Sequence, residues 1–338
     1  MRWPITTVLL ALLFACTTTY PEPDAGPDVR DGPPAGDDGG TEPDAGWDAD
    51  DGGDPGTDNG PGCDYPERSP DPRPWTVGGA GTFEALTWNL LNYPVNSQTF
   101  QRVADLIWQF DVDLVAVQEI GNLAEFERMM CLLPGYRAEL SPHAYSDGTY
   151  QKIGFVWRED VLRLVAAKMI FTWDNDFPRP AFQGEFELTL PGKPARTIIA
   201  IAVHLKAGAT AEDAARRKGA LEKLKAQMDT ICQKRPDAFT VLVGDMNDDP
   251  ADPLVDNVFP ALLNDPDHYR VLTLPLAQNR EYSYIPSRAL LDHIVSGCAL
   301  RPVSAEADIL ELDQQALGYD YRANVSDHRP AAGIFTFP

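Results

Sequence analysis

The sequence predicts an α/β sandwich over residues 76–338, with buried strands and amphipathic helices between them. Short apolar runs recur along this part of the chain. Each leads into or out of a polar side chain, which is typical of a buried strand that carries a functional group at its end. The segments between these runs place apolar residues at helical spacing. A length of about 260 residues is usual for a two-sheet sandwich.

Residues 1–16 are typical of a signal peptide that ends in a lipidation site. A basic start at Arg2 precedes an apolar stretch that is too short to span a bilayer. Leu13-Phe14-Ala15-Cys16 resembles a bacterial lipobox, so we expect Cys16 to be diacylated; a secretory signal with a chance cysteine is the alternative. Because Thr17 rather than an aspartate follows, we expect an exported cell-envelope lipoprotein anchored in the outer membrane.

Residues 17–75 predict a disordered tether. They hold 16 acidic and 3 basic residues, together with 12 prolines and 11 glycines. Such a segment buries too little apolar surface to offset the entropy lost on ordering. The domain at 76–338 has a net charge of −11 and no run of arginines, which argues weakly against strong nonspecific nucleic-acid binding.

Polar side chains stand at the ends of six predicted strands. In chain order they are Asn89 after 83–88, Glu119 after 111–118, His204 after 197–203, Asp245 and Asn247 after 241–243, Asp292 opening 292–295, and Asp327 with His328 after Val325. Carboxylates and an amide suit a hard divalent cation, and an imidazole takes up a proton near neutral pH. Singly, each has an ordinary explanation as a turn or helix cap. Together they predict one active site at the sheet edges.

Two helices are predicted between these strands. Ser97 is expected to cap the first, which runs through Phe110. Thr210 and Asp213 form a capping-box pattern that opens the second. The second helix carries one apolar stripe of Leu221, Leu224, Met228 and Ile231.

The polar motifs, taken in order, resemble the endonuclease/exonuclease/phosphatase superfamily of deoxyribonuclease I-like metallophosphoesterases. They are Trp-Asn at 88–89, Val-Gln-Glu at 117–119, His-Leu-Lys at 204–206, Gly-Asp-x-Asn at 244–247, Leu-Asp-His-Ile at 291–294 and Ser-Asp-His at 326–328. The resemblance covers roughly residues 80–338. It implies a four-layer α/β/β/α sandwich of two packed mixed β-sheets flanked by helices.

The resemblance also implies a metal site. Glu119 is similar to the main metal ligand of the family, Asn89 supports it, and Asp327 resembles a further carboxylate near the metal or the phosphate. The implied ion is Mg²⁺ or Mn²⁺, with Ca²⁺ as a possible structural ion.

The catalytic residues are implied in the same way. Asp245 and Asn247 resemble the pair that orients the attacking water and holds the scissile phosphate. His328 resembles the imidazole at the reacting phosphate, Asp292 its orienting carboxylate, and His204 the second catalytic histidine.

The chain departs from the family before the strand that starts at Ile153. Related nucleases have a carboxylate there that pairs with the second histidine, whereas this chain has Tyr150-Gln151-Lys152. His204 is therefore expected to lack its usual carboxylate partner and to act only as a hydrogen-bond donor to the phosphate. Tyr150 or Lys152 is expected to contact the substrate phosphate, as is Arg179, for which a plain loop arginine is the alternative.

Other histidines and the cysteines complete the prediction. His143, His268 and His293 are interpreted as structural or surface residues. The exported part has four cysteines, Cys63, Cys131, Cys232 and Cys298, which suggest two disulfides with three possible pairings.

The predicted function is metal-dependent phosphodiester hydrolysis. The leading hypothesis is a nuclease acting on DNA or RNA, and the alternative is a phosphodiesterase or phosphatase for lipid head groups or other small phosphoesters. A non-catalytic surface-binding protein is the hypothesis of a different class. We expect a monomer.

Overall fold

The structure is a computed structural model that describes residues 75–253, 255–297 and 304–338. The predicted signal peptide, the lipidation site Cys16 and the predicted tether, except its last residue, lie outside the described residues.

Twelve described strands form two six-stranded sheets. The first sheet has the order β11 (Ser304–Ile309), β12 (Ala331–Thr336), β1 (Phe83–Tyr93), β2 (Leu114–Ile120), β4 (Lys152–Arg158) and β3 (Tyr136–Leu140). The second has the order β5 (Leu162–Ile170), β6 (Ala181–Leu188), β7 (Arg196–His204), β8 (Ala238–Asp245), β10 (Asp292–Gly297) and β9 (Tyr269–Val271). Both sheets are mixed, because β1 pairs with β2 and β7 with β8 in parallel, while the other pairs are antiparallel.

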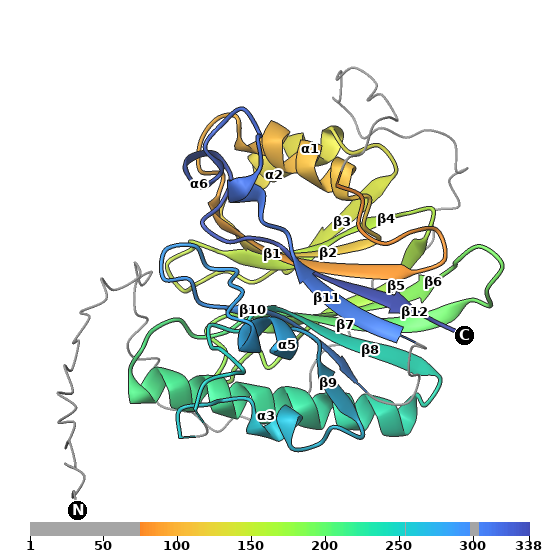
Figure 1. The fold of residues 1–338 in the computed structure, drawn as a ribbon, viewed down its shortest axis with the longest axis vertical. Coiled ribbons are helices and arrows are strands. Elements are labelled where there is room, and N and C mark those ends of the chain that lie inside the picture. The colour runs from red at the N-terminus through yellow and green to blue at the C-terminus, as the bar shows by residue number, and fades with distance from the viewer. Residues whose placement is uncertain (1–74, 254, 298–303) are drawn as a thin grey trace, which may run out of the picture. The chain divides into compact units, whose positions relative to one another are not determined.

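The two sheets pack face to face, and helices cover their outer faces (Figure 1). Phenylalanines from both sheets fill the space between them, among them Phe83, Phe155, Phe182 and Phe239. Helices α1 (Thr99–Phe110) and α2 (Leu123–Cys131) pack on the first sheet, and α3 (Ala211–Lys234) with α4 (Pro260–Leu263) packs on the second. Short helices α5 (Leu274–Gln278), η1 (Leu312–Gln314) and α6 (Tyr321–Asn324) lie in the connections. The predicted four-layer sandwich is confirmed.

The predicted helices form, with one correction at a cap. Ser97 does not cap α1, which begins at Thr99 after Gln98 without a side-chain cap bond. Asn96 makes the turn instead, since its Oδ1 accepts from the Gln98 amide at 2.9 Å. Both bonds of the capping box at Thr210 are present and the predicted stripe of α3 is buried, so these predictions are confirmed. No helix in the described part of the chain is long and apolar enough to cross a membrane.

Cys131 and Cys232 are both disulfide-bonded. Cys131 ends α2 on the first sheet, whereas Cys232 lies in α3 on the outer face of the second sheet. A disulfide requires Cα atoms within about 7 Å, so these two cysteines belong to separate bridges. Cys63 and Cys298 lie outside the described residues.

A buried carboxyl pair near the start of β1 predicts the pH dependence of stability. Burial, then the charge and the hydrogen bond of Glu84, raise the pKa of Asp113 from 3.8 to about 9. The folded protein therefore keeps a proton that the unfolded chain loses above pH 3.8, and this contribution to stability is lost as pH rises towards 9. Glu84→Gln supplies an amide donor in place of that proton. We expect its free energy of unfolding, relative to wild type, to increase between pH 5 and pH 8 in urea melts.

The control for this prediction is Glu187→Gln, a change of the same chemistry at an exposed position on β6. It should leave the dependence of stability on pH unchanged. An equal pH dependence in wild type and Glu84→Gln would show that the pair does not share a proton.

Candidate active site

Strand periodicity turns four of the predicted side chains towards the space between the sheets. Along β7 and β8, the residues at positions alternating back from His204 and Asp245 belong to the inter-sheet core. His204 lies opposite Asp245 in the parallel pairing, and Asp292 lies opposite Asp245 in the antiparallel one. Asn89 has the same inward parity and lies within β1, which continues past the expected end at residue 88 to Tyr93 with a register shift after Asn89. These residues therefore meet at one edge of the sandwich.

The turn after β8 depends on its glycine. Gly244 has φ of +148°, and a Cβ at this position would lie 2.0 Å from the Val203 carbonyl oxygen. Beyond it, Asn247 has φ of +54°, and its amide donates to Asp245 Oδ1 at 2.9 Å. Asn247 Nδ2 donates to the Leu205 carbonyl at 3.2 Å. The motif thus holds Asp245 and Asn247 in one fixed orientation.

Glu119 reaches the site through an irregularity in β2. Regular alternation would place it on the outer face with Val115 and Val117. Its φ of +61° and the register shift in the pairing of β2 change that direction. Its Oε1 accepts a hydrogen bond from Asn89 Nδ2 at 3.2 Å, and its Oε2 accepts one from the backbone N–H of Asn92 at 2.8 Å. Asn89 Nδ2 also donates to Asp245 Oδ2 at 3.0 Å, which links the two sheets.

His328 and Asp292 form a buried pair. Nδ1 of His328 lies 2.7 Å from Asp292 Oδ2, although the residues are 36 positions apart. Burial by itself lowers the pKa of His328, but the charge and hydrogen bond of Asp292 outweigh it, and the pKa is raised to about 10. The imidazole is therefore protonated, with Nε2 free of Asp292 and 4.0 Å from both Asp245 Oδ2 and Asp327 Oδ1.

Two serines that were not predicted position this pair. Ser326 Oγ donates to the Asn89 carbonyl at 2.6 Å and accepts from the His328 amide at 2.9 Å. Ser283 Oγ accepts from the Leu291 and Asp292 amides. Ser326 lies inside the Ser-Asp-His motif and was open to prediction, whereas Ser283 lies in a loop without a recognisable pattern.

His204 occupies the site without a carboxylate at its second nitrogen. Nε2 lies 3.5 Å from Asp245 Oδ2 and 3.8 Å from Glu119 Oε1. Within the described residues, Nδ1 is buried and has no hydrogen-bond partner. Burial, followed by the charges of Arg179 and His328, holds the pKa of His204 well below its usual value. His204 is therefore a neutral imidazole.

The excess of carboxylates fits a hard divalent cation. Asp245, Asp292 and His328 offer ligand atoms within 4.8 Å of one another. The imidazole and Asp292 already bond each other at 2.7 Å, and the carboxylates of Glu119 and Asp327 with the Asn89 amide oxygen are further groups that could hold a cation. Asp327 Oδ1 is buried and accepts no hydrogen bond from any described residue, as expected of an oxygen that faces a cation.

The charge of Asp245 depends on such a cation. Burial, and after it the charge of Asp292, raise the pKa of Asp245 to about 7. A divalent ion held by the neighbouring carboxylates favours the ionised form and lowers this pKa. A divalent ion held at this site would therefore stabilise the ionised form of Asp245.

Lys152 does not face the site, contrary to the prediction. Its Nζ donates hydrogen bonds to the carbonyl oxygens of Ser141 and His143, at 3.0 and 2.9 Å. The ring of Tyr150 lies 4.9 Å from the same Nζ. Successive residues of a strand point to opposite faces, so Gln151, between Tyr150 and Lys152, turns towards the site. The structure thus assigns Lys152 to the support of the loop before β4.

Gln151 is the residue of this segment that reaches the site. Its Nε2 donates to Asn92 Oδ1, and its Oε1 accepts from Arg179. Asn92 in turn holds Glu119. Gln151 therefore connects Arg179 with the loop that positions the metal ligand. The period of two residues, counted back from the inward Ile153, was a signal for it.

Arg179 and Lys152 are expected to respond differently to substitution. Arg179→Ala removes a cation whose charge reaches His204, and we expect kcat/KM to fall about 10²-fold, as for loss of one preorganised donor. Lys152→Met leaves two carbonyls unpaired, so we expect a lower melting temperature with kcat unchanged. Steady-state kinetics and thermal melts check both. A fall in kcat for Lys152→Met with an unchanged melting temperature would restore the predicted role of Lys152 at the phosphate.

The rim of the site carries aromatic rings. The ring centroid of Tyr284 lies 4.9 Å from that of His328, and Tyr284 is partly exposed. On the other side, Tyr145 Oη donates to Gln151 Oε1 at 3.4 Å. Neither residue was predicted, because both lie in loops whose positions depend on the packing of the sheets.

His293 has a structural role, as predicted. It is fully buried, with Nδ1 2.8 Å from Thr273 Oγ1 and Nε2 2.8 Å from the Asp248 carbonyl. It points away from the inter-sheet face that carries Asp292. The hydrogen bond to Asp248 supports the loop that follows Asn247.

Solved structures share this fold at low sequence identity. D. rerio TDP2 complexed with a single-strand DNA product is 13% identical, with a TM-score of 0.55, covering 75% of this chain and 98% of that chain. The human Nocturnin catalytic domain with bound sulfate is 16% identical, with a TM-score of 0.55 and coverages of 78% and 97%. A mannosyl-6-phosphatase from Bacteroides thetaiotaomicron is 14% identical, with a TM-score of 0.53 and coverages of 74% and 98%. No curated protein sequence matches the chain.

Residues 86–328 match the Endonuclease/Exonuclease/phosphatase family, a segment that contains every residue of the site described above. The predicted resemblance is therefore confirmed. The chain is a phosphoric ester hydrolase that belongs to the Endonuclease/Exonuclease/phosphatase family.

Proposed function

We propose that the protein is a Mg²⁺- or Mn²⁺-dependent phosphodiesterase that cleaves nucleic acid strands. The observation that carries the proposal is the placement of Glu119, Asn89 and Asp245 in one hydrogen-bonded group beside the His328–Asp292 pair. Oxygen ligands on one side and a protonated imidazole on the other suit a phosphate that is attacked by water. A bound divalent ion supplies charge neutralisation at the phosphate and its leaving oxygen.

The chain's own groups handle the protons. Asp292 holds His328 Nδ1, so the proton available to the substrate is on Nε2, directed towards a phosphate oxygen. Asp245 and Asn247 bind and orient the attacking water, and Asp245 accepts its proton. His204 is neutral and donates a hydrogen bond to the phosphate. Arg179 adds a positive charge on the same side.

A nucleic acid is preferred as substrate because aromatic rings border the phosphate site. Tyr145 and Tyr284 lie on loops from opposite sides of the site, and Arg179 lies between two prolines on a third loop. Rings beside a cationic phosphate site suit the bases of an unpaired strand. TDP2, which shares the fold, has been solved with a single-strand DNA product.

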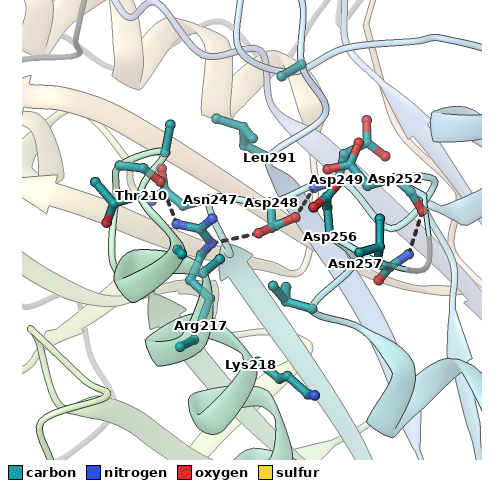
Figure 2. A pocket seen from close by; sticks show the side chains of 18 of the residues that line it. Thr210, Arg217, Lys218, Asn247, Asp248, Asp249, Asp252, Asp256, Asn257 and Leu291 are labelled. Carbon is teal, nitrogen blue, oxygen red and sulfur yellow. Dashed lines mark hydrogen bonds and ion pairs between the residues drawn. The ribbon is translucent and has the colours of Figure 1, made fainter.

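A pocket beside Asn247 favours a second candidate, the hydrolysis of small phosphoesters. The cavity has a volume of about 830 Å³, and Asp248, Asp249, Asp252 and Asp256 line it (Figure 2). Three cations, Arg217, Lys218 and Arg288, also line it, and Arg217 pairs with Asp248 at 2.7 Å. Burial and the neighbouring carboxylates raise the pKa of Asp252 to about 6. The four carboxylates exceed the three cations by one charge, which favours a small or neutral leaving group over a long polyanion.

The test compares substrates with and without EDTA. We expect Mg²⁺-dependent cleavage in gels that contain DNA or RNA, and turnover of bis-p-nitrophenyl phosphate, both lost in EDTA and in Asp245→Asn. Turnover of bis-p-nitrophenyl phosphate or sugar phosphates without cleavage of either nucleic acid would support the second candidate. Absence of all these activities would leave a binding protein on this fold.

We also propose that the enzyme is exported, lipid-anchored at Cys16 in the outer membrane, and monomeric. Its two disulfide-bonded cysteines support export, since disulfides persist in oxidising compartments. The acidic segment 17–75 would hold the domain away from the membrane. Cys16→Ser should abolish incorporation of labelled palmitate and release the protein from membranes. Unchanged labelling and fractionation would exclude the anchor.

A further inference from the structure

The loop between β5 and β6 presents a fully exposed tryptophan. Trp173 is 97% exposed, the highest value among the exposed large hydrophobic residues of the described chain. Leaving an indole ring in water forgoes one of the largest hydrophobic gains of any side chain. An interaction partner that covers the ring would recover that gain.

The loop that carries Trp173 is firmly held. At its base, the rings of Phe171 and Phe177 stack with centroids 4.5 Å apart and an interplanar angle of 12°. Lys223 of α3 bonds Asp174 at 2.6 Å and Asp176 at 2.8 Å. These contacts flank Trp173 on the C-terminal side and at the base. The exposed ring is therefore displayed from a supported loop.

A glycine in α3, Gly219, leaves room for the loop to attach to this helix. A Cβ at Gly219 would lie 2.3 Å from Asp176 Oδ2, so a larger residue would displace the loop. Lys223 pairs with both Asp174 and Asp176, so these three residues leave a net charge of −1 beside the ring.

The same loop reaches the active site. Its last part carries Arg179, which bonds Gln151 and influences His204. The strand that follows pairs Phe182 with Ala202, so its start lies beside the end of β7 that carries His204. Trp173 therefore lies at the site edge of the second sheet, on the side of Arg179.

We propose that Trp173 is a stacking platform for an unpaired base of the substrate strand, a few nucleotides from the scissile phosphate. The inference rests on the proposed nuclease function and specifies single-stranded nucleic acid as its substrate. Arg179 binds the backbone phosphate while the indole face takes a base, the combination by which proteins hold single strands without reading their sequence. A base inside a duplex is already stacked on both faces and gains nothing from the ring.

A membrane surface is a less suitable partner for this ring. Attraction to anionic lipid needs clustered lysines and arginines around the apolar side chain. The loop residues next to Trp173 are Thr172, Asp174, Asn175 and Asp176 instead. A nucleobase requires only a free aromatic face and tolerates paired carboxylates nearby.

The experiment measures kcat and KM of the exported domain for a single-stranded oligonucleotide and for bis-p-nitrophenyl phosphate. Trp173→Ala should raise KM for the oligonucleotide about tenfold or more, the effect of losing one base–aromatic stack, and leave kcat largely unchanged. Trp173→Phe should restore most of the affinity. Turnover of bis-p-nitrophenyl phosphate should be the same in all variants, because this substrate has no base.

Val165→Ala is the matched control, since it truncates another exposed hydrophobic residue on β5, 51% exposed, away from the loop. It should leave KM unchanged. An oligonucleotide with abasic positions around the cleavage site should lose the difference between wild type and Trp173→Ala.

The outcomes separate this inference from the proposed function. Wild-type cleavage of single strands with KM unaffected by Trp173→Ala overturns the stacking role alone. Turnover of bis-p-nitrophenyl phosphate without any nucleic-acid cleavage by wild type overturns both. Loss of binding to phosphatidylcholine–phosphatidylglycerol vesicles in Trp173→Ala, with oligonucleotide kinetics unchanged, would assign the ring to a membrane surface and overturn the proposal.

Discussion

Glu119→Gln is expected to abolish hydrolysis while the domain stays folded. The carboxylate accepts hydrogen bonds at both oxygens, from Asn89 Nδ2 and from the Asn92 amide. A glutamine keeps one of these acceptors and the side-chain shape but loses the negative charge that holds a divalent ion. A metal that stabilises transition-state charge contributes several kcal/mol, so we expect kcat to fall by about 10³-fold or more.

Activity, metal titration and thermal melting check this result together. The matched control is Glu187→Gln on β6, which forms an exposed pair with Arg163 and should leave all three unchanged. Full activity of wild type in excess EDTA would contradict the role of Glu119. So would a Glu119→Gln variant with the same dependence on Mg²⁺ concentration.

Loss of the paired histidine is expected to have the second large effect. General acid–base groups contribute typically about 10²–10⁴-fold, so we expect His328→Ala to lower kcat by about 10³-fold. Asp292→Asn should come close to this value, because Asp292 fixes the tautomer and favours the charged form of the imidazole. The double variant should be little worse than either single one, since the two residues act as a unit.

His204→Ala should cost less, about 10–100-fold. His204 is neutral and, among the described residues, nothing pairs with its Nδ1, so it can donate to the phosphate but is not poised for proton transfer. The three single variants and the double variant are compared by kcat under saturating Mg²⁺. A larger loss for His204→Ala than for His328→Ala would show that the proton-transfer role belongs to His204.

The fold was predictable because its signals are local. β7 and β8 are continuous apolar runs that lead into His204 and Asp245, and these runs are visible in the sequence. The capping box at Thr210 is equally local, and its two bonds form as predicted. At α1 the predicted cap was wrong by one residue, because Asn96 makes the turn and Gln98 takes the N-cap position.

Strand alternation would have helped at one part of the site and misled at another. The prediction named Tyr150 or Lys152 at the phosphate and did not consider Gln151, although alternation directs Gln151 towards Arg179 and Asn92. For Glu119 the motif was a better guide than alternation, because a left-handed backbone at Glu119 reverses the expected face. Such local irregularities depend on neighbouring strands and leave no periodic signal.

The sequence by itself determined the main polar motifs, the strands that carry Glu119, His204, Asp245 and Asp292, and the family to which the chain belongs. Its expectation that Asp327 and His328 follow a strand was wrong, because they lie between α6 and β12. The tertiary structure decided which of them meet. His328 finds Asp292, Arg179 finds Gln151, and Asn89 joins Glu119 to Asp245, across separations that range from 28 to 156 positions. These distances are set by the packing of phenylalanines between the two sheets, which brings remote strand ends to one edge. Close packing fixes such relationships only when the whole core is assembled.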